Sequence, residues 1–401
     1  ENRYPLFLEA LLLMAAFPYY DSSELKTLEA QADAILGAFR ARGYVREEPS
    51  VLQPADIFLD RSGEEIRRRT FTLTDPSGRD LCLRPDLTIP ICHQAVKGHA
   101  KFPARICYNG LVFRHQPSEP HRPTQFFQAG VELLGLDDRA AGETEIMTLA
   151  VEALRAAGLK HFTVKIGDLA LFGALVDALD VPTQWRARLK RHFWRAGYFE
   201  ALLARMTQGA ASDAQRLLGS LGGLSQSESR AAIEGLMDLV ADAPQGARTR
   251  EEIVERLLEQ AADAAALRLD PKIADVITRL LAVSGTASQA LKDIGALCKG
   301  AGIALDAPLA AMEARLSALA SLGIAADRVS FAARFGRNME YYTGFVFELW
   351  ARDKEGPVQL AGGGRYDTLL EMLGADRPVR AVGCSIRTER VLAARRQEGG
   401  A

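Results

Sequence analysis

The sequence predicts an α+β protein in which an antiparallel sheet, flanked by helices, is interrupted by a helical insertion. Segments rich in β-forming residues and separated by turns occur up to residue 168 and again from residue 325. Between them, the apolar residues follow almost only helical spacing, in a stretch rich in Ala, Leu and charged residues. We therefore expect the first part of the sheet domain at 1–168, a helical insertion at 169–324 and the second part of the sheet domain at 325–401.

The first clearly bounded helix is predicted over residues 21–43, because both of its ends are marked. Asp21 and Glu24 have the spacing of a capping box, and Gly43 suits the C-terminal stop. Its apolar residues recur at helical spacing and form one stripe, made of Leu25, Leu28, Ile35 and Phe39.

The sheet elements follow in order along the chain. Residues 44–58 are typical of a strand that Pro49 interrupts, as at a sheet edge or an interface. Residues 70–86 form a hairpin around the turn DPSG at 75–78. The remaining predicted elements are strands at 103–114, 124–135, 161–168, 328–336, 343–351 and 357–363, and a helix at 137–158 that ends at Gly158.

Composition limits the classes of function. The 401 residues are 48% hydrophobic and 25% charged, as in a globular protein, and the net charge of −2 excludes a bulk attraction to nucleic acid but not a local basic patch. The five cysteines form no CxxC pair, which favours free thiols, and His115 and His121 are too isolated for a metal site. The apolar stretch 6–17 contains Glu9 and is too short to span a bilayer, so we expect a cytoplasmic protein.

Polar residues on one predicted strand suggest a site for a small polar ligand. Gln128, Gly130 and Glu132 alternate along it, so their side chains share one face, and Arg114 precedes the loop that leads to it. The alternative is an ordinary solvated sheet face, which antiparallel sheets commonly have.

Three further segments allow a functional and a structural interpretation. The adjacent Tyr341 and Tyr342 offer stacking faces and hydroxyl donors, or they simply pack in the core. The glycines at 362–364 indicate close approach by a ligand or another backbone, or a tight turn before a helix. Residues 185–195 interleave aromatic and basic side chains, as a single-strand nucleic-acid platform does, but their spacing favours an amphipathic helix with a charged solvent face.

Taken together, these segments resemble class II aminoacyl-tRNA synthetases of the histidyl type. The segment LVFRHQPSEPHRPTQFFQAGVELLG at 111–135 resembles motif 2 of that family. The other similar segments keep the family's order: Pro49 at the motif 1 proline, LRPDLT at 83–88, the two histidine-specific signatures at 337–348 and 362–367, and motif 3 at 381–390. The resemblance covers about 1–168 and 325–395.

The resemblance implies a six-stranded antiparallel sheet, a homodimer through the motif 1 region and a histidine pocket. In that pocket Asp86 and Glu132 would pair with the amino group, and Arg114 would meet the carboxylate, or an ATP phosphate in a true synthetase. The tyrosines would pack along the imidazole. Carried over by position, the pocket consists of Asp86, Thr88, Arg114, Gln128, Glu132, Tyr341 and Tyr342.

The sequence also departs from the synthetase pattern. Gln116 stands where motif 2 has Glu, Thr124 where the family has Arg, and Asp86 where it has Glu. Most tellingly, Arg387 stands where motif 3 has a Gly that leaves room for ATP. The family also continues into an anticodon-binding domain, which we do not expect in this protein.

Two synthetase arginines are retained. Arg337 matches the catalytic arginine and Arg390 matches the motif 3 arginine, so part of the catalytic electrostatics is kept. We interpret Gln116, Thr124, Arg337, Arg387 and Arg390 together as remnants of a synthetase site, with no catalytic residue of its own.

This combination resembles the HisZ-type regulatory subunits of ATP phosphoribosyltransferase, which are synthetase paralogues. The resemblance implies a non-catalytic chain that assembles with the short HisG catalytic subunit, as a hetero-octamer. It would activate HisG and confer feedback by L-histidine on the first step of histidine biosynthesis, without a cofactor, a metal, tRNA or a membrane. The alternatives are a histidine–tRNA ligase or its catalytic fragment, and an RNA-binding module, against which the overall charge and the helical spacing of 185–195 argue.

Overall fold

The computed structural model shows an α+β protein and confirms the predicted fold class. The part of the chain that the structure describes comprises residues 19–59, 64–116, 122–193, 196–208, 220–221, 224–239, 250–265, 268–336, 341–353 and 356–399. The predicted apolar stretch 6–17 and the residues His121 and Arg337 lie outside these ranges.

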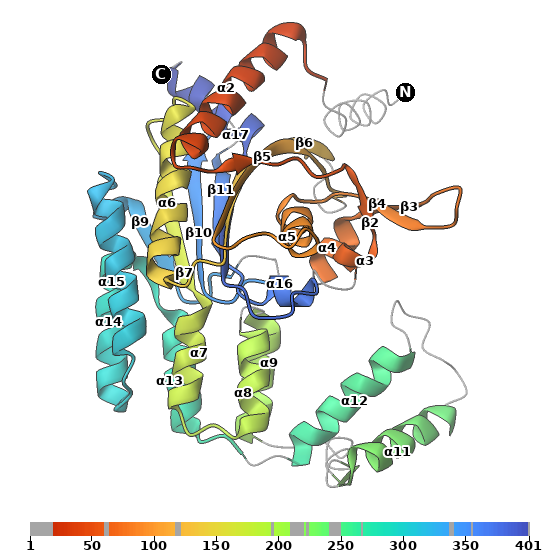
Figure 1. Cartoon of the computed structure of the whole chain (residues 1–401). Coiled ribbons are helices and arrows are strands. Elements are labelled where there is room, and N and C mark those ends of the chain that lie inside the picture. The colour runs from red at the N-terminus through yellow and green to blue at the C-terminus, as the bar shows by residue number, and fades with distance from the viewer. Residues whose placement is uncertain are drawn as a thin grey trace, which may run out of the picture. The chain divides into compact units, whose positions relative to one another are not determined.

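A nine-stranded sheet forms the centre of the fold (Figure 1). Its strand order is β1-β5-β6-β12-β11-β10-β7-β9-β8, and the six strands from β5 to β7 in this order are antiparallel to their neighbours. β1 and β9 extend this antiparallel block as parallel neighbours of β5 and β7. The bounds are β1 Val45–Arg46, β5 Ala104–Phe113, β6 Gln125–Leu134, β7 Thr163–Asp168, β8 Ser284–Thr286, β9 Val329–Ala332, β10 Phe345–Arg352, β11 Pro357–Arg365 and β12 Ala381–Arg387.

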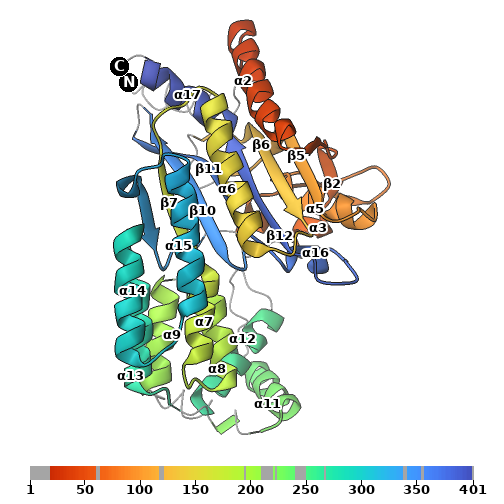
Figure 2. The same cartoon turned by 60° about the vertical axis from the view of Figure 1, so that its left-hand side comes forward.

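Helices cover both faces of the sheet (Figures 1 and 2). On one face lie α2 (Ser22–Ala41), α6 (Arg139–Ala156) and α17 (Thr388–Gly399), against the buried residues Ala129, Val131 and Leu133 of β6. On the other face lie α5 (Thr88–Lys97) and α16 (Leu369–Met372). Alternation along β6 therefore turns Gln128, Gly130 and Glu132 toward α5, as the two-residue period predicts.

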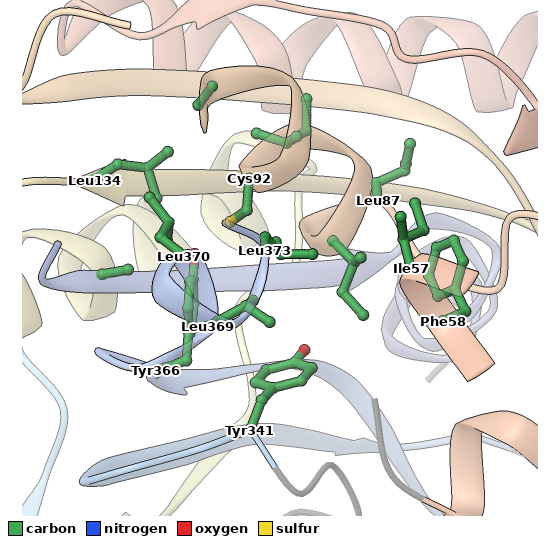
Figure 3. Packing of buried hydrophobic residues seen from close by; sticks show 14 of the residues in the cluster. Ile57, Phe58, Leu87, Cys92, Leu134, Tyr341, Tyr366, Leu369, Leu370 and Leu373 are labelled. Atoms are coloured by element: carbon green, nitrogen blue, oxygen red, sulfur yellow. The ribbon is translucent and has the colours of Figure 1, made fainter. Parts of the chain in front are cut away.

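An apolar core holds α5 and α16 against the sheet (Figure 3). Cys92 of α5 and Leu369, Leu370 and Leu373 around α16 are completely or almost completely buried, and Tyr366 joins them from the end of β11. This core holds the helix that carries Thr88 at a set distance from the sheet.

The predicted N-terminal helix is confirmed in its caps but not in its whole apolar stripe. The Asp21 carboxylate accepts hydrogen bonds from the backbone N–H of Ser23 and Glu24, both at 2.8 Å, and Gly43 follows the helix with φ 82°. Leu28, Ile35 and Phe39 are buried as expected. Leu25, the first residue of the predicted stripe, is 38% exposed.

A small second sheet has the order β2-β4-β3, with β2 Leu52–Pro54, β3 Phe71–Thr74 and β4 Asp80–Leu83. It contains the predicted hairpin, with its turn at 75–78. The predicted strand at 44–58 is wrong at its end, because residues Asp56–Leu59 form the short helix α3. A further short helix, α4, spans Glu64–Arg69. Ile57 and Phe58 are buried there in the core against α5, a contact that strand alternation does not anticipate.

The chain forms two compact units. The first comprises the described residues up to Phe172, with Val283–Ala296 and those from Leu305 onward, and the second comprises Gly173–Ala282 and Leu297–Ala304. Helix α15 (Asp306–Ser321) belongs to the first unit, so these units do not follow the expected boundaries at 168 and 324. The domain division given by those boundaries stays a prediction.

The described residues between β7 and β9 are helical apart from β8 and connecting loops. Within α8, Trp185 and Leu189, together with the following Phe193, are buried, which supports the amphipathic interpretation of this segment. No helix in the described ranges is long and apolar enough to cross a membrane. The helices are α7 Leu169–Ala178, α8 Thr183–His192, α9 Ala196–Gln208, α11 Gln226–Leu239, α12 Arg250–Ala265, α13 Pro271–Ala282 and α14 Ala287–Ala301, and a 3-10 turn, η1, spans Ala326–Arg328.

Candidate functional site

The candidate site lies on the α5 side of the sheet, over the neighbouring strands β6, β12 and β11. Gln128 of β6 is paired with Arg387 of β12, and Glu132 is paired with Gly383. Paired residues of an antiparallel ladder project to the same face, so the strand-to-helix segment at 381–390 and the motif 2 strand form one surface.

Glycines in the sheet make room for the large side chains of this surface. A Cβ at Gly383 would lie 2.7 Å from both the Glu132 carboxyl carbon and the Val131 carbonyl oxygen. A Cβ at Gly130 would lie 2.5 Å from Cζ of Tyr108. Residues 362–364 belong to β11 rather than to a turn, so the tight-turn interpretation is wrong. At Gly363 and Gly364 a Cβ would collide with the backbone of a neighbouring strand, which supports the interpretation of close approach by another backbone.

Glu132 is the most enclosed acidic group of the site. Its side chain is fully buried and accepts hydrogen bonds from Thr88 Oγ1 at 2.7 Å, from Tyr108 Oη at 2.9 Å and from the Tyr366 hydroxyl. Burial raises the pKa of Glu132 to about 7, against the three hydroxyl donors, which lower it. The group therefore changes charge near neutral pH.

Asp86 is a second buried carboxylate, and it is less well satisfied. Its Oδ1 accepts a hydrogen bond from the Ile89 N–H at 3.2 Å, whereas Oδ2 accepts none from the described residues. Burial raises the pKa of Asp86, and the nearby Arg114 guanidinium partly offsets this. A buried acceptor without a donor is costly, and a ligand N–H or ammonium group would remove that cost.

The structure brings the predicted pocket residues together. Six of the seven line one cavity. The seventh, Glu132, lies behind the cavity wall and accepts hydrogen bonds from two lining residues, Thr88 and Tyr366. Arg114 donates to the Pro85 carbonyl at 2.7 Å and, at 3.4 Å, to Gln128. The residues around the cavity are Asp86, Thr88, Arg114, Gln128, Tyr341, Tyr342, Gln359, Leu360, Ala361, Gly362, Tyr366, Gly383, Cys384, Ser385 and Arg387.

Aromatic rings form one wall of this cavity. The rings of Tyr341 and Tyr342 have centroids 4.8 Å apart, and Tyr341 meets Tyr366 edge-on at 5.7 Å. Tyr366 and Tyr108, which also hold Glu132, were not among the predicted site residues. The alternation of Tyr108 with Gly110 along one face of β5 is the signal that could have identified it.

The residues interpreted as synthetase remnants have several distinct environments. Arg387 lines the cavity, and its guanidinium carbon lies 4.6 Å from the centre of the Phe126 ring. Arg390 donates to the Gln359 carbonyl at 3.0 Å, and Gln116 donates to the Pro123 carbonyl at 2.7 Å. The Thr124 carbonyl accepts from the Arg114 N–H at 2.7 Å, so these last three stabilise the local backbone.

A network of buried ion pairs supports the site from the α6 side of the sheet, and the sequence analysis did not predict it. Glu143 of α6 pairs with Arg365 of β11 at 2.7 Å and with Arg315 of α15 at 2.7 Å. Arg315 also pairs with Asp168 of β7 at 2.6 Å, and Arg365 with Asp367 at 2.8 Å. These pairs tie the glycine-rich strand β11 to two helices and to β7, which lies two strands away in the sheet.

No group of three or more metal-binding side chains occurs within the residues that the structure describes. The functional groups of the cavity are two guanidiniums, one carboxylate with an unsatisfied oxygen, amides, a thiol, and the hydroxyls of tyrosine, threonine and serine residues. This set can bind a small zwitterion through charge and hydrogen bonds.

Comparison with known proteins shows which proteins this chain is similar to. A model of the histidyl-tRNA synthetase family matches residues 19–272 and 234–391. The ATP phosphoribosyltransferase regulatory subunit of Chelativorans sp. is 37% identical, over 91% of this chain and 97% of its own length. The protein of the same name from Brucella anthropi is 36% identical, over 90% and 97%.

Solved structures show the same fold. A protein from Bacillus halodurans, described as an ATP phosphoribosyltransferase regulatory subunit/histidyl-tRNA synthetase, superposes with a TM-score of 0.66 at 24% identity, over 94% of this chain and 82% of its own. The histidyl-tRNA synthetase of Nostoc sp. superposes with a TM-score of 0.60 at 15% identity, over 96% and 75%.

Proposed function

Because this chain belongs to the family of ATP phosphoribosyltransferase regulatory subunits, we propose that it activates a short HisG-type catalytic subunit and confers feedback by L-histidine. It acts without chemistry of its own, in the first step of histidine biosynthesis, in the cytoplasm. By the resemblance to the family, the assembly is a hetero-octamer and needs no tRNA.

The observation that carries the proposal is the combination of a retained amino-acid pocket with Arg387 in its wall. The unsatisfied oxygen of Asp86 and the tyrosine wall suit the ammonium and imidazole groups of histidine. Arg387 stands where the synthetase pattern has a glycine that clears space for ATP. The same site therefore favours binding of histidine over its activation by ATP.

Feedback requires that histidine bind the active and the inhibited assemblies with different affinities. A coupling free energy of about 1–3 kcal/mol, which is about 5- to 150-fold in affinity, gives useful regulation. The pocket suits this role, because residues of β11, β12 and α5 line it together, so that a bound ligand would contact all three elements.

Two activity measurements test the proposal. Adding the chain to a short HisG subunit should raise the rate of phosphoribosyl transfer, and L-histidine should lower the raised rate. The chain alone, with and without tRNA, should show no histidine-dependent exchange between ATP and pyrophosphate. A rate of HisG that does not respond to the chain contradicts the proposal, and exchange activity supports the ligase instead.

We also propose that the chain forms a homodimer through the motif 1 region, and the small sheet offers a surface for it. Its cross-strand pairs place six apolar side chains on one face, and every one of them is at least partly exposed. Leu52 is 45% and Leu73 is 39% exposed, whereas Cys82 and Gln53 on the opposite face are buried. This hairpin face consists of Leu52, Pro54, Phe71, Leu73, Leu81 and Leu83.

The occupant that we assign to the hairpin face is a second copy of this chain. The face begins three residues after Pro49, where the synthetase pattern places its dimer contact, and an apolar patch that meets itself across a two-fold axis needs no other partner. A stable dimer buries about 800 Å² per subunit, and this face would form the apolar centre of such an interface.

Sedimentation distinguishes the possibilities. The wild-type chain should sediment as a dimer, and Leu52→Glu and Leu73→Glu should give monomers, because each buries a charge in the interface. Leu236→Glu is the matched control, since Leu236 is 44% exposed on α11, and it should leave the dimer intact. A wild-type monomer, or dimeric Leu52→Glu and Leu73→Glu, contradicts the assignment.

A further inference from the structure

We propose that Arg387 binds the carboxylate of the amino acid that occupies the cavity. Arg387 then determines specificity for ligands that carry a carboxylate, instead of merely filling the space of a missing glycine. The inference rests on the histidine site proposed above and deepens it, because it assigns a role to a residue that the synthetase pattern does not contain.

The backbone places Arg387 beside the polar groups of the site. It is the last residue of β12 and is paired with Gln128 of β6, so the two side chains project to the same face. Gln128 lies 3.4 Å from Arg114, and Arg114 lies beside Asp86, with its Nε bonded to the Pro85 carbonyl. Arg387 thus extends a continuous row of polar groups that begins at Asp86.

Aromatic stacking orients the Arg387 side chain. Its guanidinium carbon lies 4.6 Å from the centre of the Phe126 ring, and that of Arg114 lies 5.4 Å from the same centre. A guanidinium that stacks by its face presents its N–H groups at its edge, in the planar arrangement that matches a carboxylate. The ring therefore holds two cations in place next to one cavity.

The charges around the cavity suit a zwitterion whose anionic group lies beside the two arginines. Two guanidiniums and one carboxylate, Asp86, line it, and Glu132 below has a pKa near neutral. The ammonium group of an α-amino acid would satisfy Asp86, and its carboxylate, one carbon away, would meet the arginines. An amine without a carboxylate would meet Asp86 but would offer no anionic group to either guanidinium.

Calorimetry with L-histidine and L-histidinol tests the assignment, because histidinol carries a hydroxymethyl group in place of the carboxylate. In the full chain, Arg387→Ala should weaken histidine binding about 10- to 100-fold, the range expected for lost hydrogen bonds to a charged group. It should change the affinity for histidinol less than about 2-fold. Arg387→Lys should lie between, because an ammonium keeps the charge but not the planar fork.

Arg396→Ala is the matched control, since Arg396 is an exposed arginine on α17, and it should bind histidine as the wild type does. Thermal unfolding without ligand shows whether each variant is folded, and the Lys variant keeps the test valid if the Ala variant is not. Equal losses for histidine and histidinol, or no loss for histidine, overturn the role of Arg387. A wild-type chain that binds neither ligand overturns the histidine site itself, which is a separate failure.

Discussion

Gly383 should be among the least tolerant positions of the chain, because its missing side chain makes room for Glu132. In Gly383→Ala the new Cβ would lie 2.7 Å from the Glu132 carboxyl carbon and from the Val131 carbonyl oxygen, and closer still to a carboxylate oxygen. The backbone oxygen moves only with its strand. The Glu132 carboxylate moves only by giving up hydrogen bonds to Thr88, Tyr108 or Tyr366.

The expected loss of stability follows from these two costs. Overpacking a close-packed site costs about 1–3 kcal/mol. A lost hydrogen bond to a charged group costs about 1.5–3 kcal/mol. If one such bond is lost, the free energy of unfolding should fall by about 2.5–6 kcal/mol. Urea unfolding followed by circular dichroism measures the change.

A matched glycine and a double variant make the test specific. Gly37→Ala should stabilise the protein by up to about 1 kcal/mol, because Gly37 lies within α2 and no atom approaches the position of its missing Cβ. In a Glu132→Ala background, Gly383→Ala should cost clearly less than in the wild type, because the clashing carboxylate is gone. Strictly additive effects, or a Gly383→Ala protein as stable as the wild type, would refute the reasoning.

Two further predictions concern the buried charges. Arg315→Met should lower the free energy of unfolding by about 3–5 kcal/mol, because it leaves Asp168 buried without its partner. Lys190→Met removes an exposed ion pair and should change the free energy of unfolding by less than about 1 kcal/mol. Comparable losses for the two variants in urea unfolding would contradict this prediction. Because burial raises the pKa of Glu132 from 4.5 to about 7, the folded state keeps a proton that the unfolded state has lost in this window. Stability of the wild type, relative to Glu132→Gln, should therefore fall by about 3 kcal/mol as the pH rises from 4.5 to above 7, and parallel pH profiles would disprove the shift.

Much of the site was predictable, because its signals are local or carried by motifs. The two-residue period of β6 places Gln128 and Glu132 on one face, and the resemblance to the synthetase motifs selects Asp86, Arg114 and the tyrosines. These predictions need only the direction in which a strand side chain points. Whether histidine binds there stays a prediction.

The supporting shell was not predictable in the same way. Tyr108 reaches Glu132 from β5 and Tyr366 reaches it from the residue that follows β11, and Arg315 reaches Glu143 from a helix more than 170 residues away in sequence. The residues that flank Arg315 in the sequence do not show whether this arginine forms a buried ion pair or carries a solvated charge. Only the packing of α15 against α6 decides it.

The sequence by itself determined the caps of the first bounded helix, the positions of most strands along the chain, and which side chains of a strand share a face, because these depend on neighbours a few residues apart. The tertiary structure decided which of those faces are covered. It buries Glu132 beneath Gly383, exposes Leu25 at the end of an otherwise buried stripe, and turns the apolar side of the small sheet outward. The physical reason is that burial depends on which distant elements pack together. The hydrophobic periodicity of a single helix or strand does not show which elements those are.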